Sequence, residues 1–146
     1  MRIWDYRLLP YLSDLQFKGQ CREIIAIMRD WKYKGTTNHL LINRVMDYPK
    51  TELTKYFLLY REEYFKRYGK HISDEYSVEF MHFAPTALYW RDELFKGWHN
   101  KEYLRVCMAN LYEKHFFGIG KSRIAYEEWE RLCEGYKTIT GEDYKI

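Results

Sequence analysis

The chain has 146 residues, which is enough to bury one hydrophobic core and predicts a single domain over residues 1–146. Its formal net charge of +3 is mild and excludes a histone-like, strongly basic protein, so nucleic-acid binding would depend on where its 24 Lys and Arg residues lie. Aromatic residues form 19% of the chain, and although some can stack on unpaired bases, most must be core.

The helices expected from apolar spacing, caps and breakers lie, in chain order, at about residues 13–33, 39–46, 51–68, 73–84, 86–95, 100–117 and 125–138. Residues 1–12 are expected to be irregular, because Pro10 opposes an early helix. Ser13 and Thr51 are plausible N-caps, and Gly35 is expected to end the first helix. No segment has the period-two pattern of a strand, so the sequence predicts an all-α bundle with an irregular N-terminal segment packed on the first long helix.

Three side chains of the first expected helix fall on one stripe: Gln16, Gln20 and Glu23, because residues three and four apart share a face. Gly19 lies beside them, and a glycine inside a helix costs about 1 kcal/mol relative to alanine. This predicts a close approach of another backbone or of a ligand, and we expect the N-terminal segment to pack across the Gly19 face. The alternative is an ordinary amphipathic helix, whose apolar side would be formed by Leu15, Ile24, Ile27, Met28 and Trp31.

The cysteines and histidines show no paired spacing. Cys21, Cys107 and Cys133 are odd in number and far apart, which favours a reducing compartment without disulfides. The five histidines form no His-x-x-x-His pair, so we expect no metal and no other cofactor. A nucleophilic Cys–His pair is left open, but no spacing marks one. Charged residues interrupt the N-terminus early, so no signal peptide or membrane span is expected, and we predict a cytoplasmic monomer.

Residues Gly118–Ser122 are similar to the tail of a phosphate-binding P-loop. The full pattern needs a glycine five residues before Gly120, where His115 stands, and a preceding strand, where a helix is expected. A basic turn in which Lys121 and Arg123 contact DNA phosphates is one interpretation. A helix terminator with two solvated cations is the other.

Two short motifs carry a family resemblance. Met1-Arg2-Ile3 and Arg22-Glu23 resemble, in order and separation, the pyrimidine-dimer DNA glycosylase family, typified by the phage endonuclease V. The opening Met-Arg-Ile-Trp and the motif Gly-Gln-x-Arg-Glu are most similar to the bacterial branch of that family. In this family a short N-terminal segment lies over the helix that holds Arg-Glu.

The resemblance implies a DNA glycosylase with abasic-site (AP) lyase activity on cyclobutane pyrimidine dimers in double-stranded DNA. The α-amine of Met1 would be the nucleophile, since its pKa of about 7.7–8.0 leaves part of it neutral near pH 7. Glu23 would stabilise charge on the sugar and shuttle protons. The side chains expected to contact DNA are Arg2, Gln16, Gln20, Arg22, His39, Lys121 and Arg123.

The chain departs from the family pattern at two positions. Met1 replaces the threonine whose amine reacts in the phage enzyme, and Ala26 replaces a second arginine of the helix. His39 has two interpretations: it either orients a sugar or phosphate, or is bonded to the backbone at a helix start. Two alternatives for the whole chain are a non-catalytic nucleic-acid-binding module of the same fold and a related enzyme acting on other damaged bases or on RNA.

Overall fold

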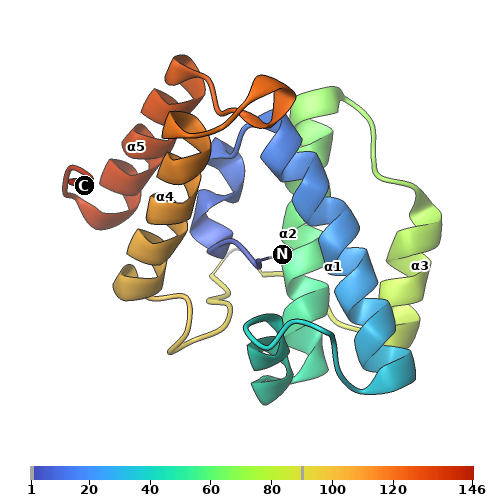
Figure 1. The fold of residues 1–146 in the computed structure, drawn as a ribbon. Coiled ribbons are helices and arrows are strands. Elements are labelled where there is room, and N and C mark those ends of the chain that lie inside the picture. The colour runs from blue at the N-terminus through green and yellow to red at the C-terminus, as the bar shows by residue number, and fades with distance from the viewer. Residues whose placement is uncertain (1, 90) are drawn as a thin grey trace. The chain divides into compact units, whose positions relative to one another are not determined.

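The computed structural model describes residues 2–89 and 91–146, apart from the side chain of Lys121. Every regular element in these ranges is a helix, which confirms the all-α class (Figure 1). The chain groups into two compact units, residues 1–3 with 19–95 and residues 4–18 with 96–146. The single domain expected from chain length stays a prediction. None of the helices in the described ranges is long and apolar enough to span a membrane.

The first unit contains most of one long helix and three further helices, namely α1 (Asp14–Lys34), η2 (Ile42–Asp47), α2 (Lys50–Tyr68) and α3 (Asp74–Phe83). Both α1 and α2 end where the sequence predicts, at Gly35 and Gly69. These glycines have φ of 72° and 69°, a left-handed conformation that costs glycine no Cβ clash. Pro49 rather than Thr51 stands at the N-cap of α2, a shift of two residues from the expectation.

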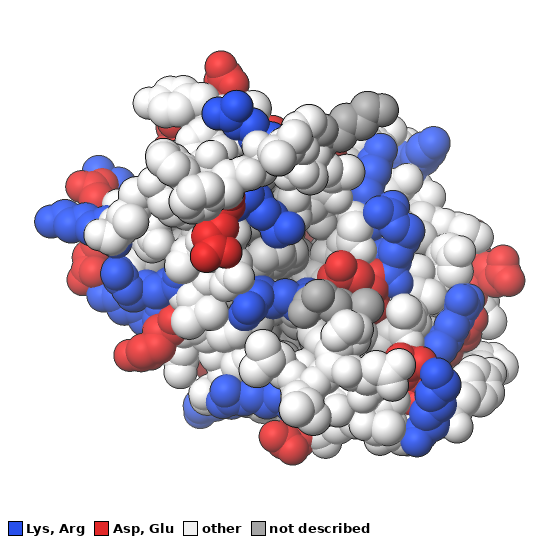
Figure 2. Space-filling view, in the orientation of Figure 1, with Lys and Arg blue, Asp and Glu red and all other residues white. Residues whose placement is uncertain are grey.

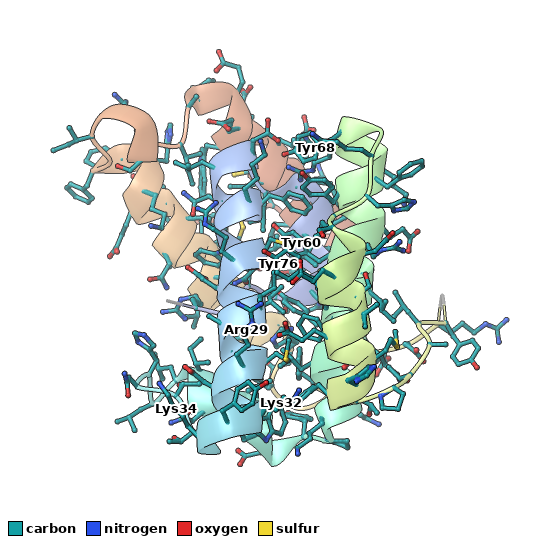
Figure 3. All side chains as sticks on the ribbon, turned by 90° about the vertical axis from the view of Figure 1, so that its right-hand side faces the viewer. Arg29, Lys32, Lys34, Tyr60, Tyr68 and Tyr76 are labelled. Atoms are coloured by element: carbon teal, nitrogen blue, oxygen red, sulfur yellow. The ribbon has the colours of Figure 1, made fainter. Side chains whose placement is uncertain are left out.

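The core of the first unit lies between α1, α2 and α3. The rings of Phe57 on α2 and Phe80 on α3 stack with centroids 4.2 Å apart. Arg29 on α1 donates to both carboxylate oxygens of Glu79 on α3, at 2.8 and 3.0 Å, and lies near Tyr76 (Figure 3). The predicted apolar side of α1 is buried at residues 24, 27 and 28, whereas Leu15 is 48% exposed.

The helix expected at residues 86–95 is absent from the described part of that segment. The backbone N–H of Tyr89 donates to the Asp92 side chain, which favours a turn. Phe95 has a positive φ of 53° and is fully buried, and its ring packs edge-on against Tyr48 and Tyr56. The apolar residues here anchor a loop to the core, so their spacing gave a false helical signal.

Two further segments differ from expectation by forming 3-10 helices. Residues 6–11, expected to be irregular, form η1 (Tyr6–Tyr11), whose first turn is capped by the Asp5 carboxylate. Pro10 is accommodated there because its fixed φ suits a 3-10 helix. The helix expected at residues 39–46 is also short and begins later, at Ile42.

The second unit contains η1, the first turn of α1, α4 (Lys101–Phe116), η3 (Gly120–Ser122) and α5 (Tyr126–Thr140). As predicted, α4 begins after Asn100, whose side chain accepts from the Tyr103 N–H at 2.9 Å. η1 packs on α5, where the Tyr11 ring lies directly against Gly135. The predicted final helix is confirmed, and it continues to Thr140.

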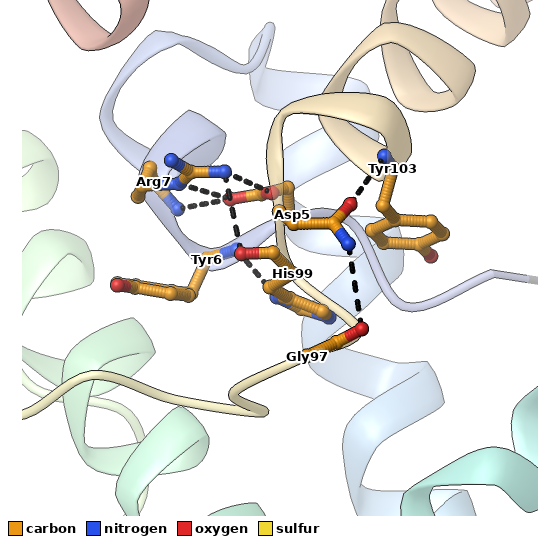
Figure 4. Close-up of polar contacts among 7 residues, drawn as sticks. Asp5, Tyr6, Arg7, Gly97, His99 and Tyr103 are labelled. Carbon is orange, nitrogen blue, oxygen red and sulfur yellow. Dashed lines mark hydrogen bonds and ion pairs between the residues drawn. The ribbon is translucent and has the colours of Figure 1, made fainter.

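An ion pair between the buried carboxylate of Asp5 and the partly exposed Arg7 fixes the start of the second unit (Figure 4). Asp5 is fully buried and accepts from two nitrogens of Arg7, at 3.0 and 2.8 Å. This hydrogen bond raises the pKa of Arg7 above its ordinary value. Arg7 also donates to the His99 carbonyl at 3.4 Å, and His99 Nδ1 accepts from the Tyr6 N–H at 3.1 Å. The segment before η1 is therefore held against the loop before α4.

Candidate functional site

The expected stripe on α1 contains a hydrogen-bonded cluster around Gln20, which is only 1% exposed. Its amide nitrogen donates to the carbonyl oxygen of Arg2 at 2.8 Å and to Glu23 Oε2 at 2.9 Å. Its amide oxygen accepts from the Tyr56 hydroxyl at 3.1 Å. All of these residues belong to the first unit. The cluster therefore joins the N-terminal residues, α1 and α2 at one point.

Glu23 is the carboxylate of this cluster, and it is half-buried. Arg22 precedes it on the helix and is exposed, so a cation stands beside the carboxylate at the surface. The Glu23 carboxylate is thus partly shielded from solvent, whereas the Arg22 guanidinium can contact an anion at the surface. A carboxylate held by an amide donor beside an exposed guanidinium suits a ligand that combines developing positive charge with phosphate.

Gly19 lies next to the cluster, and within the described residues no atom of the N-terminal segment comes within 4 Å of a Cβ built there. A Cβ added there would have only one neighbour within 4 Å among the described residues, Arg22 Nη2 at 3.9 Å. The N-terminal segment does meet the predicted stripe, through the Arg2 carbonyl at Gln20, one residue further along the helix. The part of the expectation that concerns Met1 falls outside the described residues.

Three further expected site residues belong to the first helix or to the start of the chain. The expectation that the Met1 nitrogen lies near Glu23 falls on a residue outside the described ranges. Gln16 is half-buried and belongs to the part of α1 that groups with the second unit. Gln20 is buried with its amide bonded inside the protein, so in this structure it is not displayed to DNA, contrary to the expectation for it.

His39 is exposed in the loop that follows α1. Its backbone N–H donates to Thr37 Oγ1 at 3.1 Å, and its carbonyl accepts from the Ile42 N–H at 3.0 Å. Both bonds are made by the main chain of His39, one of them with the Thr37 hydroxyl, and the residue is exposed, so the two interpretations of its ring stay predictions. The cluster around Gln20 does not include it.

The glycine-rich segment after α4 is a tight turn rather than a phosphate cradle. It follows a helix. Packing within the turn requires glycine at position 118, because a Cβ there would overlap the Lys114 carbonyl and the Arg123 backbone. Arg123 is exposed, whereas the side chain of Lys121 is outside the described atoms. The turn therefore offers the Arg123 cation to solvent but lacks the strand that a P-loop requires.

No metal centre is found in the described residues, and no reactive thiol at Cys21 or Cys133. No group of three or more His, Cys, Asp or Glu residues is placed to hold a metal ion among them. Burial raises the pKa of Cys21 to about 11 and also raises that of Cys133, so both stay thiols near pH 7. Because the thiolate is the nucleophile, neither is suited to the Cys–His alternative. Figure 2 shows Lys and Arg interspersed with Asp and Glu on the face in view.

Tyr56 is the residue of the cluster that sequence reasoning missed. It is fully buried on α2, within a run of apolar and aromatic residues in which nothing distinguishes one tyrosine from the next. A general signal was available, because a buried tyrosine hydroxyl needs a hydrogen-bond partner. The sequence does not reveal that the partner is an amide on another helix.

Comparison with known proteins was made against family models, curated proteins and solved structures. The model of the family described as pyrimidine dimer DNA glycosylase matches residues 1–76, which include the whole Gln20 cluster. No curated protein and no solved structure matches the chain significantly. The matched half carries the Arg2 segment and the Arg22-Glu23 pair in the expected order. The chain belongs to the pyrimidine dimer DNA glycosylase family.

Proposed function

We propose that the protein excises pyrimidine dimers from double-stranded DNA by a glycosylase step followed by an AP-lyase step. The observation that carries the proposal is the Gln20 amide, which holds the Arg2 carbonyl and the Glu23 carboxylate within 2.9 Å of the same nitrogen. The α-amine proposed as nucleophile belongs to the residue bonded directly to Arg2. The family match over residues 1–76 supports the choice of substrate.

In the proposed reaction the damaged nucleotide is first extruded from the duplex, which exposes its sugar carbon. The lone pair of the amine attacks C1′, and the electrons of the glycosidic bond leave with the base. Glu23 relays the two protons of the nitrogen, one to the departing base and one to the ring oxygen O4′, and cleavage of the C1′–O4′ bond gives an imine. Elimination then removes a proton from C2′ and breaks the C3′–O bond, which cuts the strand on the 3′ side.

Glu23 is proposed to act twice in this sequence. As a carboxylate it stabilises the positive charge that develops on the sugar when the base leaves. As a general base it accepts protons during imine formation and elimination. Arg2, Arg22 and Arg123 are proposed to bind phosphates, each as a charge-assisted contact. The amine suits its role because its ordinary pKa of about 7.7–8.0 leaves a neutral fraction that a lysine side chain lacks near pH 7.

The first experiment tests the nucleophile. Sodium borohydride should trap a covalent adduct between the protein and duplex DNA that carries an abasic site, since reduction freezes an imine. Acetylation of the α-amine, or added residues before Met1, should abolish the adduct. An adduct that survives blocking of the amine would move the nucleophile to a lysine, and a missing adduct with intact DNA binding would favour the non-catalytic module.

The second experiment tests the carboxylate with Glu23→Gln, which removes a charge and keeps the shape. Base release from dimer-containing DNA should fall by about 10²-fold or more, the usual scale for a lost acid–base group, while DNA binding persists. Glu130→Gln, at an exposed carboxylate of α5, is the matched control and should leave the rate unchanged. An unchanged rate in Glu23→Gln would refute the role of Glu23.

A further inference from the structure

We infer that Tyr56 and Gln20 form a positioning pair, which sets the orientation of the Glu23 carboxylate and holds the Arg2 main chain beside it. The pair is buried beneath the proposed site and acts through Glu23. The inference rests on the proposed function for the role of Glu23. Its geometry rests on hydrogen bonds inside the first unit.

The orientation of the Gln20 amide follows from its partners. The carbonyl oxygen of Arg2 can only accept a hydrogen bond, so the group facing it at 2.8 Å must be the amide nitrogen. The same nitrogen then faces Glu23 Oε2 at 2.9 Å and uses its second hydrogen there. The amide oxygen therefore faces Tyr56, whose hydroxyl donates to it. One obligate acceptor therefore fixes the direction of every bond in the cluster.

Burial separates the pair from the groups that meet the substrate. Gln20 is 1% exposed and Tyr56 is fully buried, whereas Glu23 is half-buried. The Tyr56 ring packs edge-on against the Phe95 ring, with centroids 5.7 Å apart, which fixes the position of its hydroxyl. Core packing therefore fixes the Tyr56 hydroxyl on α2, this hydroxyl orients the Gln20 amide, and the amide orients the Glu23 carboxylate on α1.

Loss of the Tyr56 hydroxyl would leave the buried Gln20 oxygen without this donor, which destabilises the observed orientation of the amide. Rotation of the amide would bring its oxygen against two acceptors, the Arg2 carbonyl and Glu23. Either outcome loosens the bridge. Because small misplacements of a catalytic group cost up to about 10²-fold in rate, the effect on catalysis should exceed the effect on binding.

The test is Tyr56→Phe, which removes the hydroxyl and keeps the ring. The rate of strand cleavage in a single turnover on abasic duplex DNA should fall about 10-fold, while affinity for a duplex with a non-cleavable abasic analogue stays within about twofold. Tyr136→Phe is the control, because Tyr136 is equally buried on α5 and its hydroxyl contacts Arg105 instead. Both variants lose a buried hydroxyl, so only a positioning role makes their cleavage rates differ.

Two readouts separate positioning from a general loss of structure. Gln20→Leu should lower the cleavage rate at least as much as Tyr56→Phe, and the double variant should lose little more, since both remove one bridge. The side-chain NH₂ signals of Gln20 in NMR spectra should be single and protected from exchange in the wild type, and broadened or shifted in Tyr56→Phe but not in Tyr136→Phe.

Equal cleavage rates in Tyr56→Phe and Tyr136→Phe, with an active wild type, would overturn the inference. A wild type that never cleaves abasic DNA would overturn the proposed function, which is a different result. In that case the Gln20 NMR signals still decide whether Tyr56 orients the amide.

Discussion

At the scale of single residues, Gly19 is a position whose glycine the described structure does not require. Apart from its chain neighbours and the backbone of its own helix, the nearest described atom to an added Cβ is Arg22 Nη2 at 3.9 Å, an ordinary van der Waals separation. The helix nevertheless carries the cost of a glycine, about 1 kcal/mol relative to alanine. A ligand that approaches α1 closely at this point would account for the residue.

Gly19→Ala should therefore stabilise the protein and weaken DNA binding. The free energy of unfolding should rise by up to about 1 kcal/mol, because alanine is the better helix former. Affinity for abasic duplex DNA should fall, because the added methyl group occupies the approach to the helix. Chemical denaturation and DNA titration of the same variant measure both effects. A gain in stability with unchanged affinity would exclude a role for Gly19 in binding.

The residue scale also shows how far sequence reasoning reached into the site. The motifs Arg2-Ile3 and Arg22-Glu23 identified the correct family, and the three-and-four spacing correctly placed Gln20 beside Glu23 on one stripe. What spacing cannot give is burial, since Gln20 was expected to face DNA and instead faces inward. The Tyr56 partner depends on how α2 packs on α1, which is a tertiary contact without a local signal.

At the scale of elements, Gly135 on α5 is the counterpart of Gly19. A Cβ there would overlap the ring of Tyr11 on η1, so this glycine is required by helix packing. The expected irregular N-terminal segment became a 3-10 helix at this contact. The helix expected at residues 86–95 is wrong for a related reason. Buried aromatic residues such as Phe95 anchor a loop there, and their spacing resembles that of a helix. The helices α1 to α5, by contrast, begin and end within two residues of the expected bounds.

Gly135→Ala should destabilise the protein even though alanine favours helix. Overpacking typically costs about 1–3 kcal/mol, which outweighs the gain of about 1 kcal/mol in helix propensity. Urea denaturation should therefore shift in opposite directions for Gly135→Ala and Gly19→Ala. If both variants were stabilised, the packing of η1 on α5 described above would be wrong.

At the scale of the whole molecule, a net charge of +3 limits how DNA can be bound. Affinity cannot come from a general excess of cations, so a few placed contacts must carry it. Each phosphate neutralised contributes a slope of about −0.9 in a plot of log affinity against log salt concentration. The number of contacts can therefore be counted by measurement.

Duplex affinity should fall steeply with salt, and Arg22→Ala should reduce the slope by about one contact. Lys137→Ala is the control, because Lys137 is paired with Asp143 at 3.3 Å and is not among the proposed contacts. Fluorescence anisotropy over a series of salt concentrations measures both slopes. A slope near zero for the wild type would reject duplex DNA as the ligand, and equal slopes in the two variants would reject Arg22 as a contact.

The bonds made by residues 2–7 also bear on how the protein can be engineered. Chain ends are usually the most tolerant part of a protein, but here the Arg2 carbonyl is bonded, Ile3 is fully buried and the buried Asp5 carboxylate is paired with Arg7. Libraries of variants should show the opposite of the usual pattern, with few accepted substitutions in this segment. Affinity tags and fusion partners belong instead after Ile146, which is 85% exposed.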